Sequence, residues 1–326
     1  MLVLRNDDCV ALLTVEGAMD ALKDMLREQA AGKIEMPERL TVDAANGSWL
    51  RLMPAIHNDS QIMGFKTMNL TPNAGVHYWI ALIDITDGRL IAQLDADYIT
   101  TLRTSATAAI ATELYAPAEI ETMALLGTST QAAGLVDAMA AVRAIPRINV
   151  FSPNPAHREA FAERVGAKTG IDVRAVGSAE EAIRSSNLVC SAYRAGKVPQ
   201  IVAADLRPGS HVNGLSSVRS FAREVADDVW MASTSVVVDH RAGVADSGDG
   251  LSVTASRAFD LATAPELFEA VRDGKRRQAS DGITLFKSVG AATQDIAVAL
   301  LAYRLAVQRG VGQDVANFPE MRVHLS

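Results

Sequence analysis

From Thr122 onward, short apolar runs alternate with amphipathic segments of helical length. The apolar runs include MALLG, RINVFS, DVRAV, NLVCSA and SVVVD. Strands that alternate with helices in this way predict βαβ units. Because both strands of such a unit run in the same direction, this half of the chain is expected to form a parallel sheet covered by helices.

The flanking segments have a different pattern. Helices are predicted at 14–31, 99–116 and 293–309, and strands at 49–56, 62–70 and 77–85. Asp87–Gly88 predicts a hairpin turn between the strand at 77–85 and the apolar run that follows it. We expect the C-terminal helix to leave the βαβ region and pack on the N-terminal part. A chain of 326 residues has room for about two domains.

The stretch TMALLGTSTQAAG passes from an apolar run through small residues into a helical segment. It fits the dinucleotide pattern G-x-G-x-x-G/A with Gly127 first, Ser129 in place of the second glycine, and Ala132 third. The small Ser129 side chain would still let a phosphate approach and could donate a hydrogen bond to it. The start of the helix would offer backbone N–H groups to an anion. Taken alone, the stretch is equally compatible with an ordinary strand–turn–helix.

The residues at the end of the next strand indicate whether the site prefers NAD or NADP. An NAD-preferring site places Asp or Glu there for the ribose 2′-hydroxyl. No carboxylate occurs from Phe151 to Arg158, where Ser152, Asn154 and Arg158 stand instead. This favours a 2′-phosphate, and therefore NADP(H) over NAD(H). The alternative is that Asn154 only caps the following helix.

Composition excludes several classes of protein. The net charge of -7 argues against a nucleic-acid or anionic-membrane partner. No apolar run approaches the ~20 residues of a membrane span, and the N-terminus does not resemble a signal peptide. The two cysteines, Cys9 and Cys190, and the six histidines have no metal-type spacing, so no metal site is expected. The two cysteines are far apart in sequence, which predicts a reducing, cytoplasmic setting.

Several segments along the chain together match one known family. They are RLMPA (51–55), GFK (64–66), TTLRTSATAAIA (100–111), GTSTQA (127–132), RPGSHVNGLSS (207–217), RE (223–224), VVVD (236–239) and TLFKSVGAATQDIAVA (284–299). With these segments the chain resembles the ornithine cyclodeaminase/mu-crystallin family over nearly its whole length. The resemblance implies a Rossmann domain at 117–290 inserted into a smaller α+β substrate-binding and dimerisation domain, formed by 1–116 and 291–326. It also implies a homodimer and NAD(P) chemistry on amino or imino acids.

The resemblance also implies roles for particular residues. Lys66 is similar to the family's active-site lysine, and Arg39 and Arg103 match the arginines that hold the substrate carboxylate, which a guanidinium can grip in a bidentate manner. Without the resemblance, Lys66 could be a solvated strand residue and Arg103 a helix-surface residue. The predicted cofactor-binding residues are Thr104, Gly127, Thr128, Ser129, Thr130, Gln131, Ser152, Asn154, Arg158, Ser191, Ser288 and Gly290.

One segment departs from part of the family. Cyclodeaminases carry an aspartate in a G-x-D-x-P-G-K-x-E-L-like stretch, and Val218 takes that position when the segments are anchored on Glu224. Asp227 or Asp228 could compensate only with a different alignment. The stretch instead resembles the reductase-type form, with Ser217, Arg219, Arg223 and Glu224 matching.

Three functions follow from these residues. The first is an NAD(P)-dependent oxidoreductase acting on CH–NH or CH–NH2 groups, which reduces an α-imino acid or ketimine and runs in reverse as an amino-acid dehydrogenase. The second is an ornithine or lysine cyclodeaminase with catalytic NAD. The third is a non-catalytic, crystallin-like ligand-binding protein. The cation set of Arg39, Lys66 and Arg103 argues against the third, and the sequence leaves the substrate's side chain open.

Overall fold

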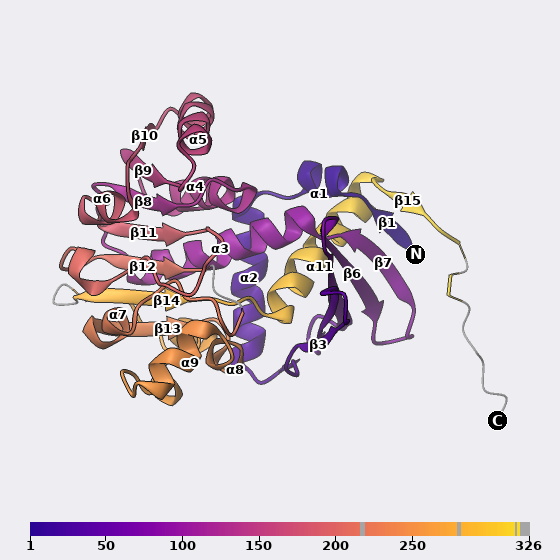
Figure 1. The fold of residues 1–326 in the computed structure, drawn as a ribbon. Helices are drawn as coiled ribbons and strands as arrows, with labels where there is room; N and C mark the ends of the chain where they lie inside the picture. The colour runs from indigo at the N-terminus through magenta and orange to yellow at the C-terminus, as the bar shows by residue number, and fades with distance from the viewer. Residues whose placement is uncertain (216–218, 279–281, 317, 320–326) are drawn as a thin grey trace. The chain divides into compact units, whose positions relative to one another are not determined.

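The computed structural model describes residues 1–215, 219–278, 282–316 and 318–319 (Figure 1). The chain divides into two compact units: Met1–Arg103 with Ala291–Ser326, and Thr104–Gly290. The first division falls inside one helix, α3 (Asp97–Tyr115). The sequence analysis places the domain boundaries at 116 and 290. Whether the parts on either side fold as domains stays a prediction.

The second unit is built on a parallel sheet. Its strands are β8 (Met123–Leu126), β9 (Arg147–Phe151), β10 (Asp172–Ala175), β11 (Leu188–Ser191), β12 (His211–Gly214), β13 (Ser233–Val238) and β14 (Ile283–Lys287). In the described part of the chain, seven strands pair in the order β10-β9-β8-β11-β12-β14-β13, and the pairings are parallel. The chain proceeds outward from β8 through β9 to β10, then returns to β11 and proceeds the other way through β12 to the edge strand β13, and β14 lies between β12 and β13. Winding in both directions from the centre is the doubly wound arrangement. The expected α/β class with a parallel sheet is confirmed.

Helices connect these strands. They are α4 (Thr130–Val142), α5 (Pro155–Thr169), α6 (Ala179–Arg184), α7 (Asp227–Ala232), α8 (Arg241–Ala245), α9 (Gly248–Ala255) and α10 (Leu267–Arg272), with short 3-10 turns at Ala203–Asp205 and Leu261–Thr263. Ser178 caps α6, because its hydroxyl accepts from the backbone N–H of Glu181. The Glu181 carboxylate accepts from Gly177, one residue before the position that a capping box would use.

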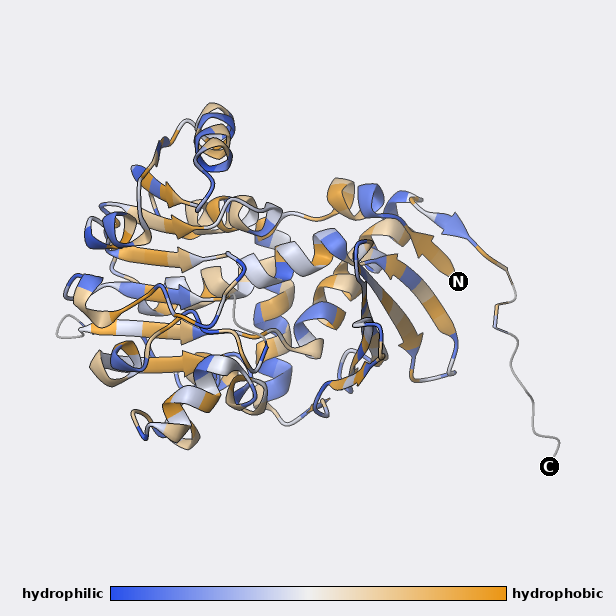
Figure 2. Ribbon diagram, viewed as in Figure 1, coloured by the Kyte–Doolittle hydropathy of each residue, from blue (hydrophilic) through white to orange (hydrophobic). Residues whose placement is uncertain are grey.

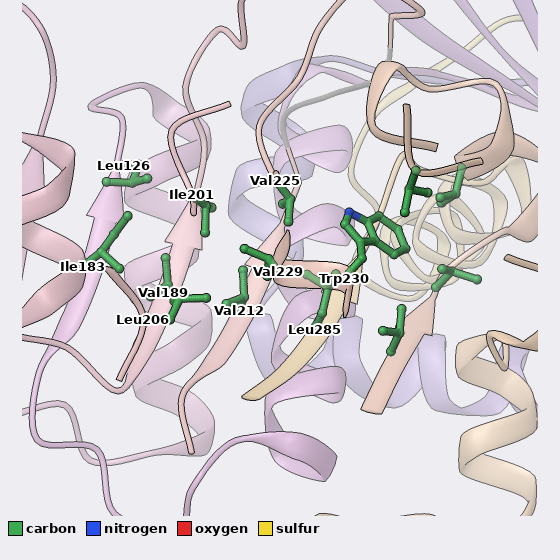
Figure 3. Packing of buried hydrophobic residues seen from close by; sticks show 14 of the residues in the cluster. Leu126, Ile183, Val189, Ile201, Leu206, Val212, Val225, Val229, Trp230 and Leu285 are labelled. Carbon is green, nitrogen blue, oxygen red and sulfur yellow. The ribbon is translucent and has the colours of Figure 1, made fainter. Parts of the chain in front are cut away.

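Alternate residues of the strands form the core of this unit. Ala124, Val189, Val212 and Leu285 lie in one row across the sheet, because their strands pair in register. Together with Trp230 of α7 they belong to one buried cluster, part of which is drawn in Figure 3. Figure 2 shows these strands mostly in hydrophobic colours. Asn213 points to the other face, where its amide donates to Thr112 of α3 over 2.9 Å.

The first unit contains a mixed sheet. Its elements are β1 (Leu2–Leu4), α1 (Asn6–Leu12), α2 (Val15–Ala30), β2 (Ile34–Glu35), β3 (Leu40–Asp43), β4 (Trp49–His57), β5 (Ile62–Thr71), β6 (Gly75–Asp84), β7 (Leu90–Asp95), α11 (Ala292–Arg309) and β15 (Gln313–Asp314). Among the described residues, the sheet runs in the order β15-β1-β7-β6-β5-β4-β2, with β3 beside β4. The predicted hairpin at Asp87–Gly88 is confirmed, since β6 and β7 are antiparallel.

The helix α11 covers one face of this mixed sheet and packs beside α2. A Cβ at Gly64 would lie only 2.8 Å from the Ile296 side chain of α11, so the glycine permits close contact. The predicted return of the C-terminal helix to the N-terminal part is therefore confirmed. Within the ranges given above, no helix is both long enough and apolar enough to cross a bilayer.

Candidate active site

A buried ionic cluster lies in the first unit, where α11 meets the sheet. The Lys66 ammonium lies 2.7 Å from Oδ2 of Asp295, and the Arg103 Nε donates to Oδ1 of the same carboxylate over 2.9 Å. The Arg103 Nη1 donates to the side-chain carbonyl of Gln294 over 3.0 Å. Lys66, Arg103 and Asp295 expose only 1%, 6% and 0% of their surface. The structure therefore brings together two of the predicted substrate-binding cations and a carboxylate to which the sequence analysis gave no role.

Local structure explains how these residues meet. Lys66 follows Gly64 by two positions in β5, so both point to the face that α11 covers. Asp295 lies in the first turn of α11, where the helix dipole stabilises a negative charge. Arg103 comes from α3, which follows directly after the sheet.

Burial determines the protonation of Lys66. Removal from water, together with the positive charges of Arg103 and Arg39, lowers the pKa of Lys66, and the Asp295 carboxylate opposes this change. The resulting pKa is about 8. Arg39, in the loop before β3, is thus close enough for its charge to act on Lys66. An amine with a pKa in this range can give and take a proton near neutral pH.

Tyr78 and His77 lie on opposite faces of β6. Tyr78 pairs with Met68 and so shares the face of Lys66. Burial raises the pKa of Tyr78, as does the charge of Asp97, so its hydroxyl is neutral. His77 instead points to the other face and is exposed.

The predicted cofactor turn follows β8 in the second unit. Gly127 has a φ of +121°, and a Cβ there would lie 2.3 Å from the carbonyl oxygen of Ala192. Its N–H donates to Phe151 over 2.8 Å. The turn thus packs directly against the ends of two neighbouring strands. This position requires glycine for both its backbone conformation and its close contact.

Ser129 is the N-cap of α4. Its hydroxyl accepts from the N–H of Ala132 and donates to Ala192, each over 3.3 Å. Ser129 is exposed, as is Thr130 after it, whereas Thr128 is half-buried. The start of α4 therefore presents polar backbone to solvent at the carboxyl edge of the sheet, where ligands of this fold bind.

A cavity of about 350 Å³ opens beside the turn. This volume lies at the lower end of the range typical of small-molecule sites, roughly 300–1,000 Å³. Two exposed cations, Arg194 and Lys197, line it from the loop after β11. Its lining residues are Leu126, Gly127, Phe151, Pro153, Tyr193, Arg194, Gly196, Lys197, Val198 and Gln200. The close backbone at Gly127 and the absence of carboxylates from this lining fit the phosphate-bearing part of a dinucleotide.

The residues that should distinguish NAD from NADP lie at the end of β9. The Arg158 guanidinium donates to the carbonyl of Ser152 over 3.0 Å and stacks over the Phe151 ring, 5.9 Å from its centroid. Asn154 caps α5 by accepting from Ala156 over 3.0 Å. The cap considered as an alternative is therefore present. Ser152 and Arg158 are the other two polar side chains predicted for the cofactor at the end of β9.

The other predicted cofactor residues of this unit are mostly engaged within the protein. Gln131 donates to Ser105 over 2.8 Å, and Thr104, at the start of the unit, is 9% exposed. Ser191 is fully buried and donates to Glu224 over 2.7 Å. Ser288 and the N–H of Gly290 both donate to Asp239 over 2.7 Å. Their cofactor contacts stay predictions.

A second buried ionic cluster lies in the second unit. Lys287 of β14 pairs with Glu224 and lies 3.0 Å from Asp249, and all three side chains are fully buried. Burial alone would lower the pKa of Lys287, but the two carboxylates outweigh it and raise that pKa. Ser217 and Val218 lie outside the described residues.

The two aspartates that might replace the missing cyclodeaminase aspartate have other partners. Asp227 accepts from Arg223 over 2.5 Å, and from Ser256 over 2.7 Å. Asp228 accepts from the N–H of Ala203 over 3.2 Å. Both therefore serve the packing of this unit. Across the described residues, no group of three or more His, Cys, Asp or Glu side chains is placed to hold a metal ion.

Comparison with known proteins adds to this geometry. The model of the ornithine cyclodeaminase/mu-crystallin family matches residues 1–310. A Δ1-pyrroline-2-carboxylate reductase of Bacillus cereus is 26% identical over 325 residues, 97% of this chain and 99% of that protein. The reductase of the same name from Paracoccus denitrificans is 32% identical over 222 residues, 67% of this chain and 69% of that protein.

A solved structure resembles the chain over its whole length. It is the Δ1-pyrroline-2-carboxylate reductase of Thermococcus litoralis in complex with NADH and L-proline, which is 30% identical with a TM-score of 0.91. The match covers 97% of this chain and 100% of that one.

Proposed function

We propose a function from the premise that the chain belongs to the ornithine cyclodeaminase/mu-crystallin family. The protein is an oxidoreductase that uses a nicotinamide dinucleotide to reduce an α-imino acid or ketimine to an amino acid. Within this class we propose a cyclic α-imino acid as substrate, since the three relatives described above are named for one. The observation that carries the proposal is the buried cluster of Lys66, Arg103 and Asp295.

Each residue of the cluster has a task in this reaction. Arg103 and Arg39 bind the substrate carboxylate, which places the C=N bond in a fixed orientation. A bound reduced nicotinamide supplies the hydride that adds to the imine carbon. Lys66 donates a proton to the imine nitrogen, so that a C–H and an N–H bond form as the C=N π bond is lost.

A substrate panel tests the proposal. The purified protein is given five- and six-membered cyclic imino acids, and 2-oxo acids with ammonia or methylamine, while oxidation of NADPH and NADH is followed by absorbance. We expect cofactor oxidation that depends on the imino acid and is fastest with a cyclic one. Release of ammonia from ornithine or lysine without net cofactor turnover would instead identify a cyclodeaminase.

We also propose that the protein prefers NADP(H) to NAD(H). Ser152 and Arg158 define the end of β9, and no carboxylate lies between them. Arg194 and Lys197 add two positive charges to the adjoining cavity. A 2′-phosphate would therefore meet cations where an NAD-preferring site presents a carboxylate.

Ser152→Asp should reverse this preference. A carboxylate at the end of β9 would repel a 2′-phosphate and accept from a ribose hydroxyl. We expect the Kd for NADPH to rise at least tenfold, ~1.4 kcal/mol, while NADH binds as well or better. Titration of both cofactors by fluorescence measures this. Ala167→Asp adds the same charge to an exposed site near the other end of α5 and should change neither Kd. Equal losses for both cofactors in Ser152→Asp would contradict the assignment.

A homodimer is our proposal for the assembly. The face of the mixed sheet opposite α11 exposes apolar side chains, with Leu40, Val42, Leu50 and Trp79 between 37% and 57% exposed. Val42 and Leu50 are paired across β3 and β4, and Trp79 contacts Phe65 edge to face. Such a contiguous apolar face is typical of surfaces that are buried between subunits.

Leu50→Glu should disrupt that dimer, because a desolvated charge without a partner is costly in an interface. Light scattering coupled to gel filtration should show a dimer for the wild type and a monomer for the variant. Val10→Glu is the matched control, since Val10 is about as exposed, 48% against 44%, but lies on α1. Dissociation by both variants, or by neither, would place the interface elsewhere.

We place the protein in the cytoplasm. Both cysteines, Cys9 and Cys190, are buried free thiols. Burial raises the pKa of each thiol to about 12, so neither forms a reactive thiolate at neutral pH. Unpaired thiols are usual in a reducing compartment.

A further inference from the structure

We infer that Asp295 is the positioning residue of the substrate site, because its single carboxylate holds the Lys66 ammonium and the Arg103 guanidinium in their working geometry. The inference rests on the proposed function and extends it to a residue of the C-terminal helix. Asp295 touches neither substrate nor cofactor in this account. It acts through the two cations that do.

The two carboxylate oxygens of Asp295 are divided between the cations. Oδ2 lies 2.7 Å from Lys66, and Oδ1 accepts from Arg103 over 2.9 Å. Gln294, the preceding residue of α11, accepts from the neighbouring nitrogen of Arg103 over 3.0 Å. Two successive residues of one helical turn thus fix the guanidinium from its edge. A shift of Asp295 would move both cations together.

The first turn of α11 is itself held in place. Thr293 forms a 2.8 Å hydrogen bond to His57 at the end of β4, and both side chains are 1% exposed. Burial lowers the pKa of His57 to about 4, so the imidazole is neutral and this contact persists across the physiological range. Asp295 therefore projects from a backbone that is anchored to the sheet.

Asp295 also balances the charge of the site. The charged groups that act on Lys66 are Arg103 on α3, Arg39 before β3 and Asp295 on α11, and Tyr78 of β6 shares its face of the sheet. Tyr78 is neutral and adds no charge. Asp295 therefore raises the pKa of Lys66, whereas the two arginines lower it. Without this carboxylate, burial and the arginines would favour the neutral amine. A larger share of Lys66 would then lack the proton that the imine nitrogen needs.

The pH profile of Asp295→Asn tests the inference. In the wild type, kcat/KM for imine reduction should fall as pH rises through about 8, where Lys66 loses its proton, and the reverse oxidation should rise over the same range. In Asp295→Asn we expect both the fall in reduction and the rise in oxidation to occur at least one pH unit lower. We also expect KM to rise at least tenfold, because Arg103 is no longer held. Asp84→Asn is the matched control: Asp84, at the end of β6, is another carboxylate of this unit, and it accepts from Thr86 rather than from the cluster.

The outcomes separate the inference from the proposed function. A wild type that oxidises no cofactor with any imine overturns both. Wild-type turnover with an unshifted profile and unchanged KM in Asp295→Asn overturns the positioning role alone. If Asp295→Asn does not fold by circular dichroism, Asp295→Glu replaces it, because it keeps the charge but displaces it by one methylene. In the glutamate variant, reduction should still fall near pH 8 as in the wild type, but kcat should be at least tenfold lower. A kcat and KM equal to those of the wild type would overturn the inference.

Discussion

Lys66→Met should lower kcat for imine reduction at least ~100-fold, the lower end of what a positioned general acid contributes. Methionine has nearly the length of lysine but carries no proton to donate. The fold should survive, because Asp295 keeps Arg103 as its partner at 2.9 Å and methionine fills the space of a side chain that is 1% exposed. Steady-state rates and cofactor Kd are measured on the same preparation.

The control is Lys33→Met, which removes an exposed lysine from the same unit. It should leave kcat unchanged. The cofactor Kd should be equal in the wild type and in Lys66→Met, since Lys66 belongs to the first unit and the predicted phosphate turn to the second. A Lys66→Met enzyme within about tenfold of wild type, ~1.4 kcal/mol of barrier, would show that the proton comes from another group.

The parallel sheet could be predicted because each of its strands and helices is indicated by residues that are neighbours in sequence. Most strands of the second unit contain a short apolar run bounded by a turn, and the connecting helices show helical periodicity. The glycine of the cofactor turn could be placed for the same reason, since Gly127 ends an apolar run and begins a helix within three residues. The helix caps at Ser178 and Asn154 follow equally from neighbouring residues.

The partners of the site residues could not be predicted, because they are distant in sequence. Arg103 and Asp295 are 192 positions apart, and Lys287 and Glu224 are 63 apart. Asp295 was part of a matching segment, yet an acidic residue in the first turn of a helix is ordinary and gives no sign of what it faces. Only the register of β5 and the packing of α11 place it against Lys66. The same register puts His77 on the opposite face, which the alternating pattern alone could not decide.

Gly127→Ala should weaken binding of the preferred dinucleotide at least tenfold and also destabilise the second unit. Two costs combine at this position. An L-residue is strained at a φ of +121°, and the new Cβ would lie 2.3 Å from the carbonyl oxygen of Ala192, far inside van der Waals contact. The turn must open to relieve that collision, which moves the start of α4 and the phosphate-binding backbone with it. Thermal unfolding of the apo protein and a fluorescence titration measure the two effects.

Gly170→Ala separates strain from collision, because Gly170 also has a positive φ, +75°, but a Cβ there meets nothing within 4 Å. It ends α5 in the same unit, so Ala should cost ~1–2 kcal/mol of stability and leave the cofactor Kd unchanged. Gly127→Ala should lower Tm further than this control, because the collision is added to the strain. If Gly127→Ala binds NADPH and NADH like the wild type, the pyrophosphate does not approach this turn, and Gly127 serves only the packing of β8 against β11.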